Sequence, residues 1–167
     1  MQSLPAPVAD LMLENRWFLA TAESCTGGMI AAACTELAGS SNWFERGFVT
    51  YSNHAKTQML GVDAALIAAH GAVSEPVVRA MAAGALTHSQ AQVAIAVTGV
   101  AGPGGGSAEK PVGLVWLGFA VPGTQQTEIY SECRQFAGDR TAVRAATVQY
   151  ALQRLVELLK PPRTPPG

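Results

Sequence analysis

The segment WFLATAESCTGG, residues 17–28, restricts the fold more than any other part of the chain. Its apolar start, Trp17–Ala20, predicts a strand, and small polar residues and glycines follow at once. A helical pattern begins directly afterwards, with apolar residues at Met29, Ile30, Ala33 and Leu37. A strand that turns straight into a helix places Ser24 at a sheet edge, beside free backbone N–H groups and the positive end of a helix dipole. Such a turn suits a serine nucleophile, a bound anion, or both.

The rest of the chain alternates strand-like and helical segments. Apolar or alternating runs predict strands at 17–23, 44–52, 92–98, 112–121 and 125–136. Helical periodicity or short helical turns occupy 6–16, 27–38, 53–60, a stretch opening at Ser74, and 139–160, with a short segment at 63–70. This order, with its late hairpin, predicts an α/β fold, namely a three-layer α/β/α sandwich with a mixed, mostly parallel sheet. We expect one domain over residues 1–160 and a disordered proline-rich tail at 161–167.

Composition narrows the functional classes. The 167 residues are 49% hydrophobic and carry a net charge of −1, so no global basic field attracts nucleic acid or a membrane surface. No apolar run reaches the roughly 20 residues of a membrane span, and the N-terminus does not resemble a signal peptide. The three cysteines form no metal-spaced set. We therefore expect a cytoplasmic protein with reduced thiols, no metal and no cofactor.

Ser24 and Lys56 are candidates for a serine nucleophile and its base, although each residue also has a plain structural interpretation. Ser24 suits either a helix cap or a nucleophile, which needs a base. The three histidines lie in surface-like positions, which makes a serine–histidine–aspartate triad a weak hypothesis. Lys56, after the predicted strand that ends at Tyr51–Ser52, is a solvated lysine or, if burial lowers its pKa, a base for serine. Tyr51 either hydrogen-bonds the lysine or the serine, or is a surface aromatic.

A glycine-rich loop follows the apolar strand at 92–98. Residues 98–107, TGVAGPGGGS, include five glycines, and lie where α/β sheets place ligands. The loop is either a flexible hairpin connection or an anion-binding segment, and it matches neither a Walker loop nor a dinucleotide-binding motif. Arg140 opens the last helix, where a cation is mildly disfavoured. It pairs either with a phosphate or with Asp139 or Glu132.

Several motifs in order resemble one known family, the C-terminal domain of competence/damage-inducible protein A (CinA). They are AESCTGG (22–28), FERGFVTYSNHAK (44–56), LGV (60–62), HGAVSEPV (70–77), VTGVAGPGGGS (97–107), EKPVGLVW (109–116) and GDRTAVR (138–144). The resemblance covers roughly residues 5–158. The family includes stand-alone nicotinamide-nucleotide amidases. It implies hydrolysis of the carboxamide of nicotinamide mononucleotide (NMN) to nicotinic acid mononucleotide and ammonia, as in pyridine nucleotide salvage.

The resemblance also implies roles for individual residues. Ser24 would be the nucleophile, Lys56 its base, Tyr51 an assisting group and Arg140 a substrate-binding residue. We expect further substrate or oxyanion contacts from Thr26, Gly27, Gly28, Thr98, Gly99, Gly104, Gly105, Gly106 and Ser107. The family also suggests a homodimer. Two alternatives remain open at this point: an amidase for another nucleotide amide, and a non-catalytic nucleotide-binding or regulatory module.

Overall fold

A five-stranded mixed sheet forms the centre of the computed structural model, which describes residues 3–161. The strands are β1 (Leu19–Glu23), β2 (Phe44–Val49), β3 (Val93–Gly99), β4 (Leu114–Pro122) and β5 (Thr127–Gln135), in the spatial order β2-β1-β3-β4-β5. β1 pairs in parallel with β2 and β3, whereas β4 pairs antiparallel with β3 and β5. Four of the five strands therefore run in one direction and β4 opposes them, although only two of the four pairings are parallel.

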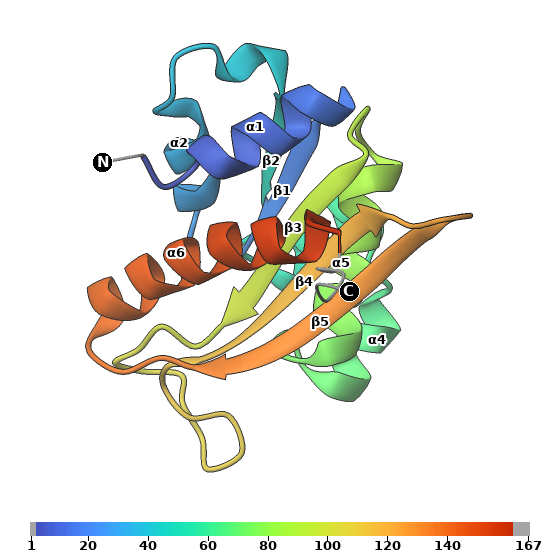
Figure 1. The fold of residues 1–167 in the computed structure, drawn as a ribbon. Helices are drawn as coiled ribbons and strands as arrows, with labels where there is room; N and C mark the ends of the chain where they lie inside the picture. The colour runs from blue at the N-terminus through green and yellow to red at the C-terminus, as the bar shows by residue number, and fades with distance from the viewer. Residues whose placement is uncertain (1–2, 162–167) are drawn as a thin grey trace, which may run out of the picture.

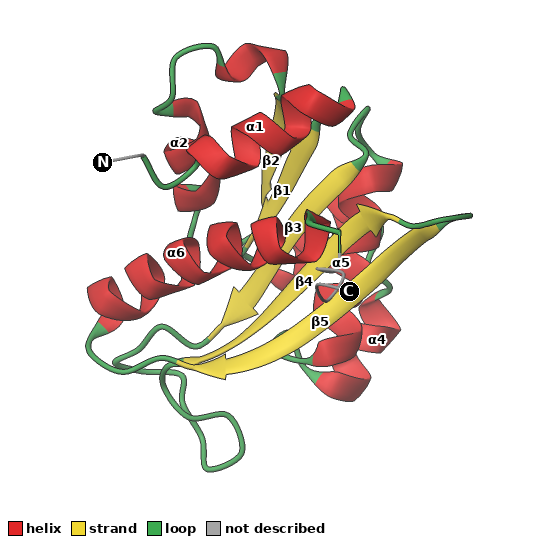
Figure 2. Cartoon of the chain, viewed as in Figure 1, coloured by secondary structure: helices red, strands yellow, loops and turns green. Residues whose placement is uncertain are grey.

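Helices cover both faces of this sheet (Figures 1 and 2). On one face lie α1 (Ala6–Asn15), α2 (Met29–Thr35) and the long α6 (Arg140–Leu159), with a 3-10 turn at Ser40–Asn42 nearby. On the other lie α3 (Asn53–Leu60), α4 (Ala64–His70) and α5 (Glu75–Thr87). The predicted three-layer α/β/α sandwich is confirmed.

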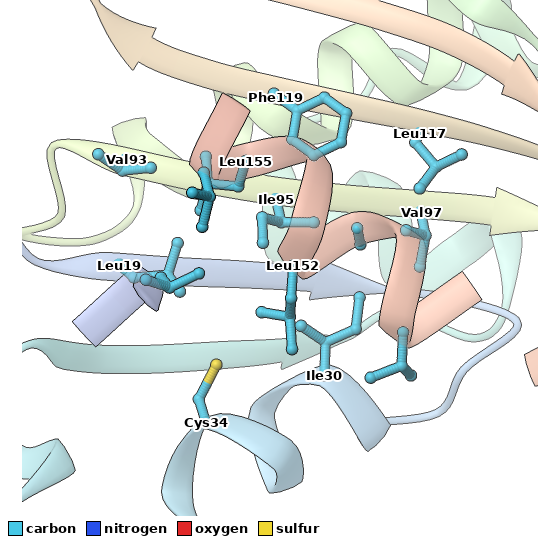
Figure 3. Packing of buried hydrophobic residues seen from close by; sticks show 14 of the residues in the cluster. Leu19, Ile30, Cys34, Val93, Ile95, Val97, Leu117, Phe119, Leu152 and Leu155 are labelled. Carbon is cyan, nitrogen blue, oxygen red and sulfur yellow. The ribbon is translucent and has the colours of Figure 1, made fainter. Parts of the chain in front are cut away.

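Two apolar clusters hold the layers together. One joins β1, β3 and β4 to the α1, α2 and α6 layer, and Figure 3 shows Ile95, Leu152 and Phe119 among its members. The other joins the opposite face of the sheet to α3, α4 and α5 through Phe48, Leu60 and Met81. Because side chains alternate along a strand, Glu23 and Ser24 at the end of β1 face opposite layers.

Two helix starts differ from the sequence expectation. α2 begins at Met29 rather than 27, because Gly27 and Gly28 have positive φ angles of 59° and 104° that a right-handed helix excludes. Ser74 occupies the N-cap position of α5, but its hydroxyl donates to the Gly71 carbonyl at 2.7 Å and makes no cap bond. Asp139 caps α6 by accepting from the Ala142 N–H at 2.9 Å.

Within residues 3–161, no helix is both long and apolar enough to cross a membrane. Most of the expected tail, residues 162–167, lies outside the described residues. Cytoplasmic location and a homodimer remain predictions.

The packing of α3 on α5 predicts the effect of one substitution. A Cβ on Gly84 of α5 would lie 2.1 Å from the Leu60 carbonyl oxygen at the end of α3. Alanine is worth about 1 kcal/mol more than glycine in a helix, but overpacking typically costs about 1–3 kcal/mol. We expect Gly84→Ala to lower the free energy of unfolding, measured by urea denaturation.

Gly104→Ala is the matched control, because nothing lies within 4 Å of its added Cβ. It should leave the urea midpoint almost unchanged. A Gly84→Ala protein as stable as the wild type would show that α3 is not held by this close approach.

Candidate active site

A cavity of about 260 Å³ lies at the carboxyl ends of β1 and β3. Parallel strands of an open sheet place ligands at this edge. The lining comes from four places: the turn after β1, the β2–α3 junction, the α4–α5 connection with the end of β3, and the start of α6. The lining residues are Ser24, Cys25, Tyr51, Asn53, Lys56, Ala72, Val73, Thr98, Gly99, Ala101 and Arg140.

Ser24 and Lys56 meet inside this cavity. The Lys56 Nζ lies 3.1 Å from the Ser24 Oγ, 3.0 Å from the Thr50 carbonyl oxygen and 3.4 Å from the Tyr51 carbonyl oxygen. Backbone hydrogen bonds fix Ser24 and Thr50, whose carbonyl oxygen contacts the Lys56 amine. The Ser24 N–H donates to the Val97 carbonyl at 3.1 Å, and the Thr50 N–H donates to the Glu23 carbonyl at 2.9 Å. The strand ends thus set the geometry of the pair.

Lys56 is buried without a carboxylate partner. Its side chain is 1% exposed, and among residues 3–161 it forms no salt bridge. Removal from water disfavours the ammonium form, so burial lowers the pKa of Lys56 below its ordinary value of 10.5. A buried amine with a lowered pKa can accept a proton.

The positive end of α2 is already occupied. The buried Glu23 carboxylate accepts from the Ile30 N–H at 2.7 Å, the Ala31 N–H at 3.0 Å and the Thr26 hydroxyl at 2.6 Å. Glu23 therefore replaces a capping side chain, which Gly28 at the N-cap cannot supply. The expectation that this helix end is open to an anion is wrong.

The other residues of this turn also differ from expectation. Thr26 is fully buried and its hydroxyl is used by Glu23, so its side chain does not reach the cavity. Gly27 and Gly28 shape the turn but are not among the lining residues. The Cys25 N–H, next to Ser24, donates to no backbone carbonyl of residues 3–161, and it lies within hydrogen-bond reach of its own thiol.

Arg140 and Tyr51 bridge the cavity mouth. The Arg140 guanidinium donates to the Tyr51 hydroxyl at 3.1 Å and to the Gly102 carbonyl at 2.9 Å. Among the described residues neither Asp139 nor Glu132 pairs with Arg140, since Asp139 caps α6 and Glu132 binds Arg154 at 2.6 Å. The Tyr51 hydroxyl contacts Arg140 rather than Lys56 or Ser24, and Tyr51 meets Lys56 only through its carbonyl oxygen.

Only the first part of the glycine loop reaches the cavity. Thr98, Gly99 and Ala101 line it, and the Thr98 hydroxyl donates to the Ala72 carbonyl at 3.0 Å. The remainder projects from the molecule as the yellow loop of Figure 1. Gly104, Gly105, Gly106 and Ser107 are exposed in it and do not line the Ser24 cavity. The structure therefore does not bring these four residues to the Ser24–Lys56 pair.

Cys25 lines the cavity beside Ser24 but has a poorly ionised thiol. The residue is 6% exposed, and burial raises its pKa from 9.0 to about 11. The thiolate is the reactive form of cysteine, so little of it is present near neutral pH. No group of three or more His, Cys, Asp or Glu residues within 3–161 is placed to hold a metal ion.

Sequence reasoning missed three residues of the site. Glu23 precedes Ser24 within ESCTGG, Asn53 lies within YSNHAK, and Arg144 lies one helical turn after Arg140. Their motifs were visible, but nothing in the sequence showed which side chain faces which group. Arg144 in particular donates to the carbonyl oxygens of Cys25 and Thr26.

Comparison with known proteins identifies the family of this chain. The chain matches the CinA C-terminal domain family over residues 1–159. It is 58% identical over 135 residues to the nicotinamide-nucleotide amidohydrolase PncC of Escherichia coli K12, covering 81% of this chain and 80% of that protein. A Pseudomonas putida protein of the same name is 56% identical over 138 residues, covering 83% and 84%.

A solved structure has the same fold. The crystal structure of a CinA superfamily protein from Klebsiella pneumoniae 700603 superposes with a TM-score of 0.87 at 41% sequence identity, covering 93% of this chain and 95% of that one. The family match spans nearly the whole sequence and includes the Ser24 turn, the Lys56 segment and the start of α6. This chain belongs to the CinA C-terminal domain family.

Proposed function

We propose that this chain is an amidohydrolase that converts NMN to nicotinic acid mononucleotide and ammonia, with Ser24 as nucleophile and Lys56 as base. The observation that carries the proposal is the 3.1 Å approach of the Lys56 amine to the Ser24 hydroxyl inside a cavity. The relatives named nicotinamide-nucleotide amidohydrolase support the amidase activity and its substrate.

The base role requires a neutral Lys56 amine, and the three neighbours of Nζ accommodate this form as well as an ammonium. A neutral amine has two N–H donors and one lone pair, and two of its three neighbours are carbonyl oxygens that only accept. The N–H groups therefore go to Thr50 and Tyr51, which leaves the lone pair for the Ser24 hydroxyl. In this arrangement Ser24 donates to Lys56, as a nucleophile does to its base.

The reaction then follows in two halves. Lys56 takes the Ser24 proton while the Oγ attacks the carboxamide carbon, and the tetrahedral intermediate collapses as ammonia leaves with a proton from Lys56. Lys56 then takes a proton from a water molecule as the water oxygen attacks the acyl-enzyme. The C–Oγ bond breaks, the carboxylate is released, and Lys56 returns the proton to the Ser24 Oγ. The Cys25 N–H beside Ser24 donates to no backbone carbonyl of residues 3–161, and it is the donor for the oxyanion in both halves.

A second hollow provides room for the rest of a mononucleotide. It has a volume of about 480 Å³ and shares Ala101 and Arg140 with the Ser24 cavity. Its other lining residues are Gly102, Pro103, Val112, Gly138, Asp139 and Thr141. Arg140 stands between the two hollows, and among residues 3–161 it is bound only to neutral acceptors, so its charge is available for the substrate phosphate.

The first prediction concerns the nucleophile and its base. Ser24→Ala should abolish ammonia release from NMN, and Lys56→Arg should do the same because a guanidinium keeps its charge and cannot act as a base. Ammonia release is measured from NMN, nicotinamide riboside, nicotinamide and NAD, with melting curves as a folding control.

A folded Ser24→Ala protein with near-normal kcat would disprove the nucleophile assignment. Turnover of a different amide by the wild type, with none of NMN, would indicate another nucleotide amidase. Binding of NMN without hydrolysis of any of these amides would indicate the non-catalytic nucleotide-binding module instead.

A second prediction tests the phosphate contact. Arg140→Ala should raise KM for NMN by roughly 10-fold to 100-fold, because a charge-assisted hydrogen bond contributes about 1.5–3 kcal/mol. The riboside lacks the phosphate, so it should be a poor substrate of the wild type and lose little more in the variant. An equal loss on both substrates would assign Arg140 a structural role at the cavity mouth.

A third prediction separates Cys25 from Ser24. With a thiol pKa of about 11 and no base of its own, Cys25 is not expected to act as a nucleophile. Cys25→Ala should retain most of its kcat for NMN. If Cys25→Ala were inactive while Ser24→Ala stayed active, the thiol would be the attacking group.

A further inference from the structure

Arg144 is a half-buried cation whose hydrogen bonds within residues 3–161 go to the backbone of the Ser24 turn. Its Nε donates to the Cys25 carbonyl at 3.1 Å and its Nη2 donates to the Thr26 carbonyl at 3.2 Å. Among residues 3–161 it forms no salt bridge. Arginines inside proteins usually pair with carboxylates. Arg144 instead donates to two carbonyl oxygens next to the nucleophile.

The guanidinium reaches these oxygens because α6 passes close to the turn. A Cβ on Gly27 would lie 3.5 Å from the Arg144 Nη2, which places the guanidinium directly against the turn. Arg144 follows Arg140 by one turn of α6, so the same helix that brings Arg140 to the cavity mouth brings Arg144 to the nucleophile. One rigid helix therefore contacts both ends of the site.

The contacts fix the orientation of the amide next to Ser24. The Ser24 carbonyl accepts from the Gly27 N–H at 3.0 Å, and in a planar trans peptide the N–H points opposite to the carbonyl. The Cys25 N–H is therefore directed away from the interior of the turn, and no backbone carbonyl of residues 3–161 accepts from it. The next carbonyl, that of Cys25, is held by Arg144. Both peptide groups that flank the Cys25 α-carbon are thus fixed.

We infer that Arg144 is a positioning residue for catalysis: it clamps the Ser24 turn so that the Cys25 N–H stays aimed at the oxyanion. This inference rests on the function proposed above. The guanidinium also adds a positive charge beside the turn on which negative charge develops in the transition state. The Glu23 carboxylate accepts from donors of the same turn, the Thr26 hydroxyl and the Ile30 N–H. Arg144 donates to its acceptors, the Cys25 and Thr26 carbonyls.

The experiment compares Arg144→Lys and Arg144→Met with Arg79→Met as the matched control. Arg79 is also half-buried and donates to one neutral acceptor, the Ser131 Oγ at 2.9 Å, but it belongs to α5 and does not line the Ser24 cavity. Loss of a whole oxyanion donor costs about 10²–10³ in kcat, so misplacing one should cost about 10-fold to 10²-fold in Arg144→Met.

The expected pattern distinguishes positioning from simple stability. KM for NMN should stay near the wild-type value, Arg144→Lys should lose less than Arg144→Met because it keeps the charge, and low concentrations of methylguanidinium should restore part of the kcat of Arg144→Met. Arg79→Met should keep its kcat. Wild-type kcat in Arg144→Met, or an equal loss in Arg79→Met, would overturn the inference.

A second readout does not depend on turnover. Amide NMR spectra of the free protein should show displaced Cys25 and Thr26 resonances in Arg144→Met and unchanged ones in Arg79→Met. Unchanged Cys25 and Thr26 resonances in Arg144→Met would overturn the clamp even if NMN is hydrolysed. If wild-type protein hydrolyses no NMN, the proposed function fails, and these spectra alone decide whether Arg144 holds the turn.

Discussion

The burial of one lysine amine without an opposite charge is the constraint on which the site depends. Lys56 is 1% exposed, and its amine is surrounded by two carbonyl oxygens and the Ser24 hydroxyl. Burial lowers its pKa, so between the folded value and 10.5 the unfolded chain binds more protons than the folded one. Stability attributable to this group therefore rises with pH across that window and is lower below it. Below that window, burial of Lys56 lowers the free energy of unfolding. The amine is nevertheless held by α3, which carries Lys56, and by Ser24, Thr50 and Tyr51 at the strand ends.

Opposite charges lie at the starts of two of the helices that begin near the cavity, α2 and α6. The N-terminus of α2 is occupied by the buried Glu23 carboxylate, which makes the Ser24 turn rigid and closes that helix end to a ligand. The start of α6 instead presents Arg140, whose partners are a phenol and a carbonyl. A substrate with a neutral amide at one end and an anion at the other fits this division, with the amide at Ser24 and the anion at Arg140.

Sequence patterns were sufficient for the fold and for naming Ser24, Lys56, Tyr51 and Arg140, which the structure brings to one cavity, but not for the rest of the site or for its contacts. The apolar strands, the glycine stops and the Asp139 cap follow from local physical rules, so their positions could be predicted. The role of Glu23 could not, because whether a carboxylate caps a helix depends on a turn geometry set by two positive-φ glycines. The expectation that residues 104–107 line the cavity was wrong for a related reason. Glycines permit close approach to a ligand, but they do not show which part of a loop faces the cavity. Arg144 needed the tertiary packing of α6, 118 to 119 residues away in sequence from the carbonyls it binds.

The most direct test of the central claim is the pKa of Lys56 itself. NMR titration of the side chain of isotopically labelled lysine, assigned with Lys56→Arg, measures it in the free protein. If Lys56 is the base, it shows a single-proton transition with a midpoint below 10.5, and this midpoint coincides with the acidic limb of kcat/KM for NMN hydrolysis. A Lys56 midpoint at or above 10.5, in a protein that is fully active near neutral pH, would contradict the assignment of Lys56 as the base for Ser24.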